Sequence, residues 1–145
     1  AVALDPPASG VMRCDAGALP VAASSFHLVT CGLMMGHSPD MVGALAEIGR
    51  ALAPDGNLDL TDFHPEATRH GWERTFTDPA TGRVHAIEQH LHPITAYREA
   101  LHAAGLVEED FGELEYQGVP VVFGLRARRR VPVRSPDAPV EAPAP

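Results

Sequence analysis

Residues 38–61 read SPDMVGALAEIGRALAPDGNLDLT, and this stretch decides the fold class. Ser38 and Pro39 are typical of a helix start, as a cap and a first helical residue. The apolar residues that follow recur at the spacing of one helix face: Met41, Leu45, Ile48 and Leu52. Pro54-Asp55-Gly56 predicts a turn, and residues 58–61 are typical of a short buried strand. The stretch therefore predicts a helix that turns into a strand.

Outward from this stretch, short apolar runs alternate with helical segments. We expect buried strands at residues 1–4, 11–14, 26–31, 58–61 and 119–127. A second helix is expected at 95–104, ended by Gly105, with a strand at 106–114 after it. Between residues 72 and 90, two β-prone pieces flank DPATG at 78–82, which predicts an inserted hairpin. The alternation predicts an α/β fold with a mostly parallel sheet and flanking helices.

Composition limits the class of protein. The 145 residues, 45% of them hydrophobic, suit one domain with a real core. A net charge of −8 argues against nucleic acid as a partner. No apolar run approaches the length of a membrane span, and the first residues lack a secretory pattern, so we expect no membrane partner and a cytoplasmic location. Two cysteines exclude a disulfide framework, and eleven arginines without lysine suggest a high-GC bacterial source.

The end of the chain has a different composition. Residues 131–145 hold five prolines and no apolar periodicity, which predicts a disordered tail. We therefore expect a folded domain at 1–130 and a tail at 131–145.

Five short blocks carry a resemblance to a known family. They are VALDP at 2–6, CDAGALP at 14–20, SFHLV at 25–29, HSPD at 37–40 and EIGRALAPDG at 47–56. In this order they resemble the class I S-adenosylmethionine-dependent methyltransferases of the small-molecule type, over about residues 1–127. The resemblance implies a Rossmann-like α/β fold, S-adenosylmethionine as cofactor and a small-molecule methyl acceptor.

The resemblance also implies a cofactor site. It comprises Asp5, Asp15, Ala16, Cys31 and Gly32. Asp5 would accept hydrogen bonds from ribose hydroxyls, and the family counterpart of Asp15 accepts from the adenine amine. Each acid has an alternative role as the cap of a turn or helix.

Two histidines are candidate catalytic residues. His37 matches a frequent family histidine near the transferred methyl group, and a histidine there can take a proton from a nucleophile. Its alternative role is to cap the following helix. His64 follows the strand at 58–61 and is the second candidate. For His85, His90 and His92 the spacing gives no standard metal-ligand set, so we expect no metal.

The chain departs from the family in three ways. The family's first strand and its glycine-rich turn have no counterpart before residue 1, and residues 6–10 are too few for a parallel crossover. Asp59 lies inside an expected buried strand, so it needs a partner or a less buried position. We therefore expect a fragment or shortened form with an open sheet edge that favours self-association. The alternative function is a non-catalytic, methyltransferase-like module that binds a partner chain.

Overall fold

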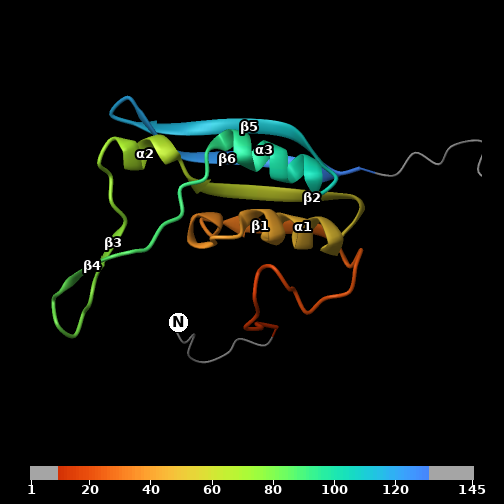
Figure 1. Cartoon of the computed structure of the whole chain (residues 1–145), viewed down its shortest axis with the longest axis horizontal. Coiled ribbons are helices and arrows are strands. Elements are labelled where there is room, and N and C mark those ends of the chain that lie inside the picture. Colours follow the sequence, from red (N-terminus) through yellow and green to blue (C-terminus); the bar gives the residue numbers. More distant parts are fainter. Residues whose placement is uncertain (1–9, 131–145) are drawn as a thin grey trace, which may run out of the picture.

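The computed structural model describes residues 10–130 (Figure 1). One sheet contains four strands in the order β1-β2-β6-β5, and β3 and β4 form a separate two-stranded sheet. The strands are β1 Phe26–Gly32, β2 Leu52–Phe63, β3 Thr75–Thr77, β4 Val84–Ala86, β5 Leu106–Tyr116 and β6 Val119–Arg129. The helices are the short 3-10 helix η1 Met35–His37, α1 Met41–Ala51, α2 Pro65–Arg69 and α3 Ile94–Ala103.

The α/β class is confirmed, but the mostly parallel sheet is wrong. Only β1 and β2 run parallel, while β6 pairs antiparallel with both β2 and β5. The reason is the connection between β5 and β6, which consists of Gln117 and Gly118, with φ angles of 53° and 76°. Two left-handed residues form a tight hairpin turn, and such a turn joins antiparallel strands only. The sheet is therefore mixed.

The stretch that decides the fold class forms the predicted helix and strand with changed ends. The helix cap is Asp40 rather than Ser38, because the Asp40 carboxylate accepts a hydrogen bond from the Gly43 amide at 2.8 Å. Pairing with β1 extends β2 back to Leu52, and residues 53–56 bulge between the paired positions. Asp55 has a φ of 61°, and a side chain on Gly56 would meet the Ala53 carbonyl oxygen at 2.9 Å. The turn residues therefore shape a bulge.

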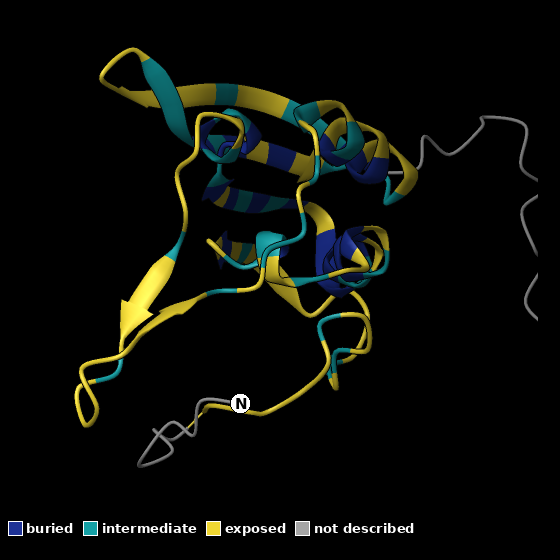
Figure 2. Ribbon diagram, turned by 60° about the vertical axis from the view of Figure 1, so that its left-hand side comes forward, coloured by how far each residue is buried: buried dark blue, intermediate teal, exposed yellow. Residues whose placement is uncertain are grey.

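Helices α1 and α3 cover one face of the sheet and build the core with it (Figures 1 and 2). The buried side chains from the helices include Met41, Leu45, Ile48, Tyr97 and Leu101. Leu58, Leu60, Phe123 and Leu125 meet them from β2 and β6. This apolar layer is the main source of stability.

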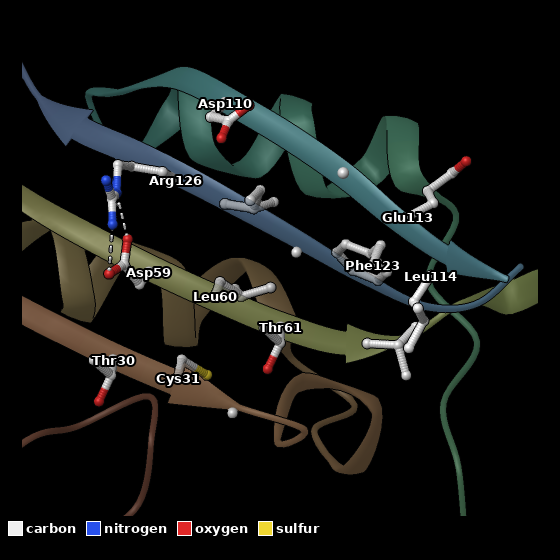
Figure 3. A pocket seen from close by; sticks show the side chains of 15 residues that line it. Thr30, Cys31, Asp59, Leu60, Thr61, Asp110, Glu113, Leu114, Phe123 and Arg126 are labelled. Carbon is white, nitrogen blue, oxygen red and sulfur yellow. Dashed lines mark hydrogen bonds and ion pairs between the residues drawn. The ribbon is translucent and has the colours of Figure 1, made fainter.

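The opposite face of the sheet is open in the described part of the chain (Figure 3). A row of small residues crosses it in register: Gly32, Thr61, Gly124 and Gly112. Beside this row, the Arg126 guanidinium donates hydrogen bonds of 2.7 and 3.1 Å to the two carboxylate oxygens of Asp59. Asp59 therefore has the partner, and the half-exposed position, that its place in a strand demanded.

Most of the other predicted strands and helices form, and one predicted strand does not. The strands at 106–114 and 119–127 and the inserted hairpin are confirmed, and so is the second helix, which Gly105 ends with a φ of 73°. A strand also forms at 26–31, but it is mainly exposed rather than buried, because it is the edge strand of the sheet. A strand at 11–14 is wrong, because these exposed residues pair with no strand of the described chain. The strand expected at 1–4 and the tail expected at 131–145 lie outside the described residues. No helix within 10–130 is long and apolar enough to cross a membrane.

Candidate functional site

The candidate site lies at the carboxyl ends of β1 and β2. Because these two strands are parallel and adjacent, the loops that follow them emerge side by side. The loop after β1 contains η1 and ends in His37, and the loop after β2 contains His64. The sheet therefore brings both histidine candidates to one edge, as the expected motifs required.

An apolar cavity of about 240 Å³ lies between β1, α1 and the segment before β1. Its lining includes three of the residues that the family resemblance assigns to the cofactor: Ala16, Cys31 and Gly32. Leu19, Val29, Met34 and Ile48 supply most of the remaining wall. The structure thus brings Ala16 to the same cavity as Cys31 and Gly32, although a loop and most of β1 separate them in the chain. Asp5 lies outside the described residues.

Asp15 stands in a tight turn just before this cavity rather than at a strand end. Its Oδ1 accepts a hydrogen bond from the Gly17 amide at 2.9 Å, and the Ala18 amide bonds to the Asp15 carbonyl oxygen at 3.1 Å. This is the turn-capping role that was the alternative for Asp15. The side chain is exposed, and Oδ2 takes no hydrogen bond from residues 10–130. One carboxylate oxygen is therefore free to meet a ligand.

The segment before β1 is held in place by α1. The Arg50 guanidinium donates to the carbonyl oxygens of Val21, at 2.9 Å, and Leu19, at 3.1 Å. Glu47 accepts from the Leu19 amide at 2.9 Å and also pairs with Arg50. These bonds hold the pKa of the Glu47 carboxyl below its usual range, and they fix the wall of the cavity next to Ala16.

The buried Asp62 side chain links the loop after β1 to the end of β2 and to α3. Its side chain is 1% exposed and accepts hydrogen bonds from the Gly36 amide at 2.7 Å, the Phe63 amide at 2.8 Å and the Tyr97 hydroxyl at 3.1 Å. A buried carboxylate is stable only when it is satisfied in this way. Asp62 therefore fixes η1 to the end of β2 and to α3.

The segment 88–92, after the hairpin, fastens onto η1 and the residue after it. The His37 Nδ1 lies 3.2 Å from the Glu88 carbonyl oxygen, the His90 amide donates to the Gly36 carbonyl at 2.8 Å, and His92 Nε2 lies 2.9 Å from the Ser38 carbonyl. We call residues 88–92 the strap. The strap and η1 therefore form one rigid edge of the site.

The two histidine candidates differ in their free nitrogen atoms. A carbonyl oxygen only accepts hydrogen bonds, so His37 must donate from Nδ1, and Nε2 of the neutral ring keeps its lone pair. His37 is also exposed, and it does not cap α1, because Asp40 does. His64 is 6% exposed, accepts from the Glu66 amide with Nδ1 and donates from Nε2 to Glu113 at 3.0 Å. Both His64 nitrogens are therefore engaged inside the protein.

Cys31 lies at the boundary between the core and the cavity. Burial, with the nearby Asp62 carboxylate as a smaller cause, raises the pKa of its thiol to about 11. The thiol is therefore neutral at physiological pH and acts as a small apolar wall residue.

Sequence reasoning missed Asp62 and Tyr97, which hold the site, and the helices η1 and α2. Asp62 lies at the end of β2, and its partners are 26 and 35 positions away in the chain, so no local pattern shows them. Among residues 10–130 no three histidine, cysteine or acidic side chains lie close enough together to hold a metal ion. His90 and His92 lie in the strap rather than on a strand.

A second hollow, of about 620 Å³, lies on the open sheet face (Figure 3). It shares Cys31 and Gly32 with the apolar cavity. Its volume comes from the row of small residues, and its central charge, Asp59, is already paired with Arg126. We therefore place the site at the smaller cavity, where the loops converge.

Comparisons with known proteins agree with this fold. The family model of a methyltransferase domain matches residues 3–59. None of the curated proteins matches the sequence.

Solved structures share the fold at low sequence identity. A methyltransferase from Methanosarcina mazei is 19% identical with a TM-score of 0.62, and the match covers 81% of this chain and 66% of that one. One from Mesorhizobium loti is 18% identical with a TM-score of 0.64, over 81% and 68%. The Burkholderia thailandensis 1,6-didemethyltoxoflavin-N1-methyltransferase, solved with 1,6-didemethyltoxoflavin and S-adenosylhomocysteine, is 20% identical with a TM-score of 0.55, over 81% and 49%. This chain spans about half to two thirds of their length.

The fold and the loop edge define an α/β domain of the methyltransferase type. The resemblance found in the sequence is confirmed, because residues 3–59 match the model of a methyltransferase domain and S-adenosylmethionine-dependent methyltransferases of known structure share the fold.

Proposed function

We propose that this chain takes part in methyl transfer from S-adenosylmethionine to a small molecule. The observation that carries the proposal is the apolar cavity that brings Ala16, Cys31 and Gly32 together, with Asp15, whose Oδ2 accepts no hydrogen bond from residues 10–130, directly before Ala16 in the chain. A flat heteroaromatic ring with an exocyclic amine suits an apolar slot with one carboxylate acceptor at its mouth. The cavity takes the adenine end of the cofactor, and the cofactor, when bound, supplies an activated methyl group.

His37 is the residue that accepts the proton from the methyl acceptor. Its Nδ1 is committed to the Glu88 carbonyl, so Nε2 has the lone pair that a general base needs. His64, the second candidate, positions the loop after β2 through its bonds to Glu66 and Glu113. Most of the acceleration comes from holding donor and acceptor in line and excluding water.

Calorimetric titration with S-adenosylhomocysteine tests the proposal. Asp15→Asn exchanges a pure acceptor for a mixed donor and acceptor, so the affinity falls by about tenfold, or about 1.4 kcal/mol. Asp78→Asn is a matched control, because Asp78 also accepts from a backbone amide two residues later, that of Ala80 at 2.8 Å, but lies in the hairpin. No binding to the wild-type chain, or an equal loss in both variants, contradicts the proposal.

A second candidate function is a module that binds a partner chain. It is favoured by the edge strand β1, whose outer side pairs with no strand of residues 10–130 and whose Leu28 is 54% exposed. Leu28→Lys separates the two functions. It prevents association in analytical ultracentrifugation if β1 is an interface and leaves S-adenosylhomocysteine binding unchanged.

A further inference from the structure

Arg74 carries a half-buried guanidinium for which residues 10–130 supply neither an ion pair nor a hydrogen bond. Arg50, Arg69, Arg98, Arg126 and Arg128 all have acidic partners. The Arg74 guanidinium carbon instead lies 4.1 Å from the centroid of the Phe63 ring. The aromatic face orients the planar group and leaves its five donors for another partner.

This guanidinium forms part of the wall of a cavity of about 180 Å³. The other walls are mainly apolar and come from Phe63, Ala67, Trp72, Val121 and Val122, with Gln89 as a second polar group. The Trp72 ring makes a T-shaped contact with the Tyr116 ring, with 5.5 Å between the ring centroids. Glu73 also lines the cavity, but its carboxylate does not pair with Arg74. The cavity thus combines mainly apolar walls with the unpaired Arg74 guanidinium, and Glu73 and Thr68 complete its polar lining.

The cavity adjoins the candidate site. A narrower space shares four residues with it, Phe63, Thr68, Arg74 and Gln89. Gly36 of η1 and Asp62 also line that narrower space. Arg74 therefore borders a small space that Gly36, in the loop that ends in His37, also lines.

We propose that this cavity holds the methyl acceptor and that the acceptor is a compact aromatic carboxylate. The carboxylate accepts hydrogen bonds from the Arg74 guanidinium, whose planar fork matches it, and the ring lies against Phe63 and Trp72. The volume is below the 300–1,000 Å³ that is usual for drug-sized ligands, so a molecule with one ring fits best. This inference rests on the proposed function, since it names the substrate class of that site.

The fluorescence of Trp72, the one tryptophan of the chain, tests the inference without any cofactor. Benzoate is titrated into the full chain beside benzamide, which has the same shape and no charge. We expect a saturable change with benzoate and binding about tenfold weaker with benzamide. Arg74→Gln weakens the binding of benzoate about tenfold and leaves that of benzamide unchanged, so the two ligands then bind equally. Arg74→Lys keeps part of the preference for benzoate, because the positive charge remains although the planar guanidinium is lost.

Arg83→Gln is the matched control, since Arg83 is an exposed arginine of the same hairpin that lines no part of this cavity. A melting curve of each variant shows that it is folded. The inference is overturned if benzoate gives no saturable change, if acid and amide bind equally, or if Arg83→Gln and Arg74→Gln lose the same affinity. Calorimetry with S-adenosylhomocysteine is independent of this result. If benzoate binds as expected but S-adenosylhomocysteine does not bind, the proposed function fails and the cavity is not a methyl-acceptor site. If S-adenosylhomocysteine binds but benzoate does not, only this inference fails.

Discussion

The Tyr97 hydroxyl donates a hydrogen bond of 3.1 Å to Oδ2 of Asp62, and both residues are buried beneath the site. The same carboxylate oxygen accepts from the Gly36 amide, so one side chain joins α3, β2 and η1. Burial, with the Asp62 charge as a second cause, raises the pKa of Tyr97 far above its ordinary value. The tyrosine therefore remains a hydrogen-bond donor at physiological pH.

Asp62→Ala leaves the Gly36 amide and the Tyr97 hydroxyl without a partner. We expect a loss of about 3 kcal/mol in the free energy of unfolding, because each buried unsatisfied donor costs about 1–3 kcal/mol. Tyr97→Phe alone costs about 1 kcal/mol, and it costs almost nothing in the Asp62→Ala background. Urea denaturation of the four proteins measures this coupling, and additive losses would show that the bond contributes nothing.

The two histidines should respond differently to replacement. His37→Ala lowers the rate of methyl transfer by about 10²-fold or more, because it removes the base. The melting temperature falls only slightly, because the other loss is one exposed hydrogen bond to the Glu88 carbonyl. His64→Ala lowers stability by about 1 kcal/mol through loss of the α2 cap. Rate assays and melting curves distinguish the roles. A rate loss with His64→Ala that exceeds the loss with His37→Ala would reverse the assignment.

Cys31 provides a labelling assay for the apolar cavity. The thiolate is the reactive form, and the raised pKa of about 11 keeps Cys31 neutral. At pH 8 we expect a disulfide reagent to modify the exposed Cys14 rapidly and Cys31 slowly. The Cys31 rate then rises about tenfold for each pH unit up to about pH 11. S-adenosylhomocysteine should slow only the Cys31 phase, and protection of both thiols equally would place the ligand elsewhere.

The same titration affects stability at high pH. The folded pKa of Cys31 lies above the ordinary value of 9.0, so the folded state favours the neutral thiol. The corresponding stability is complete below pH 9 and declines as the pH rises toward 11. Cys31→Ala should flatten this decline in denaturation curves measured from pH 8 to 11, and an unchanged slope would contradict the assignment.

The ion pair between Asp59 and Arg126 acts at low pH. Its hydrogen bonds hold the pKa of Asp59 below its ordinary value of 3.8. Stability from this pair is therefore present above that value and is lost as the pH falls through the lower, folded pKa. Because the pair is partly exposed, Asp59→Asn should cost at most about 1 kcal/mol at pH 7 and less in high salt. A loss of several kcal/mol would mean that the open sheet face is covered in solution.

The sequence by itself determined the elements that depend on local pattern. The apolar stripe from Met41 to Ile48 fixed the α1 helix, and Gly105 ended α3 as expected, because only residues within a few positions of one another decide these features. The five short blocks that resemble the methyltransferase family also predicted the position of the loop after β1, because the blocks on either side of this loop occur in the family's order.

The tertiary structure decided what depends on pairing between distant segments. An apolar run such as residues 11–14 or 119–127 looks the same whether it is unpaired, parallel or antiparallel, because periodicity does not report the direction of the neighbour. The choice between His37 and His64 likewise depends on partners at Glu88 and Glu113, about 50 residues away in each case. Hydrogen bonds over such distances form only after the sheet has brought the loops together, so the free nitrogen of His37 belongs to the fold rather than to any motif.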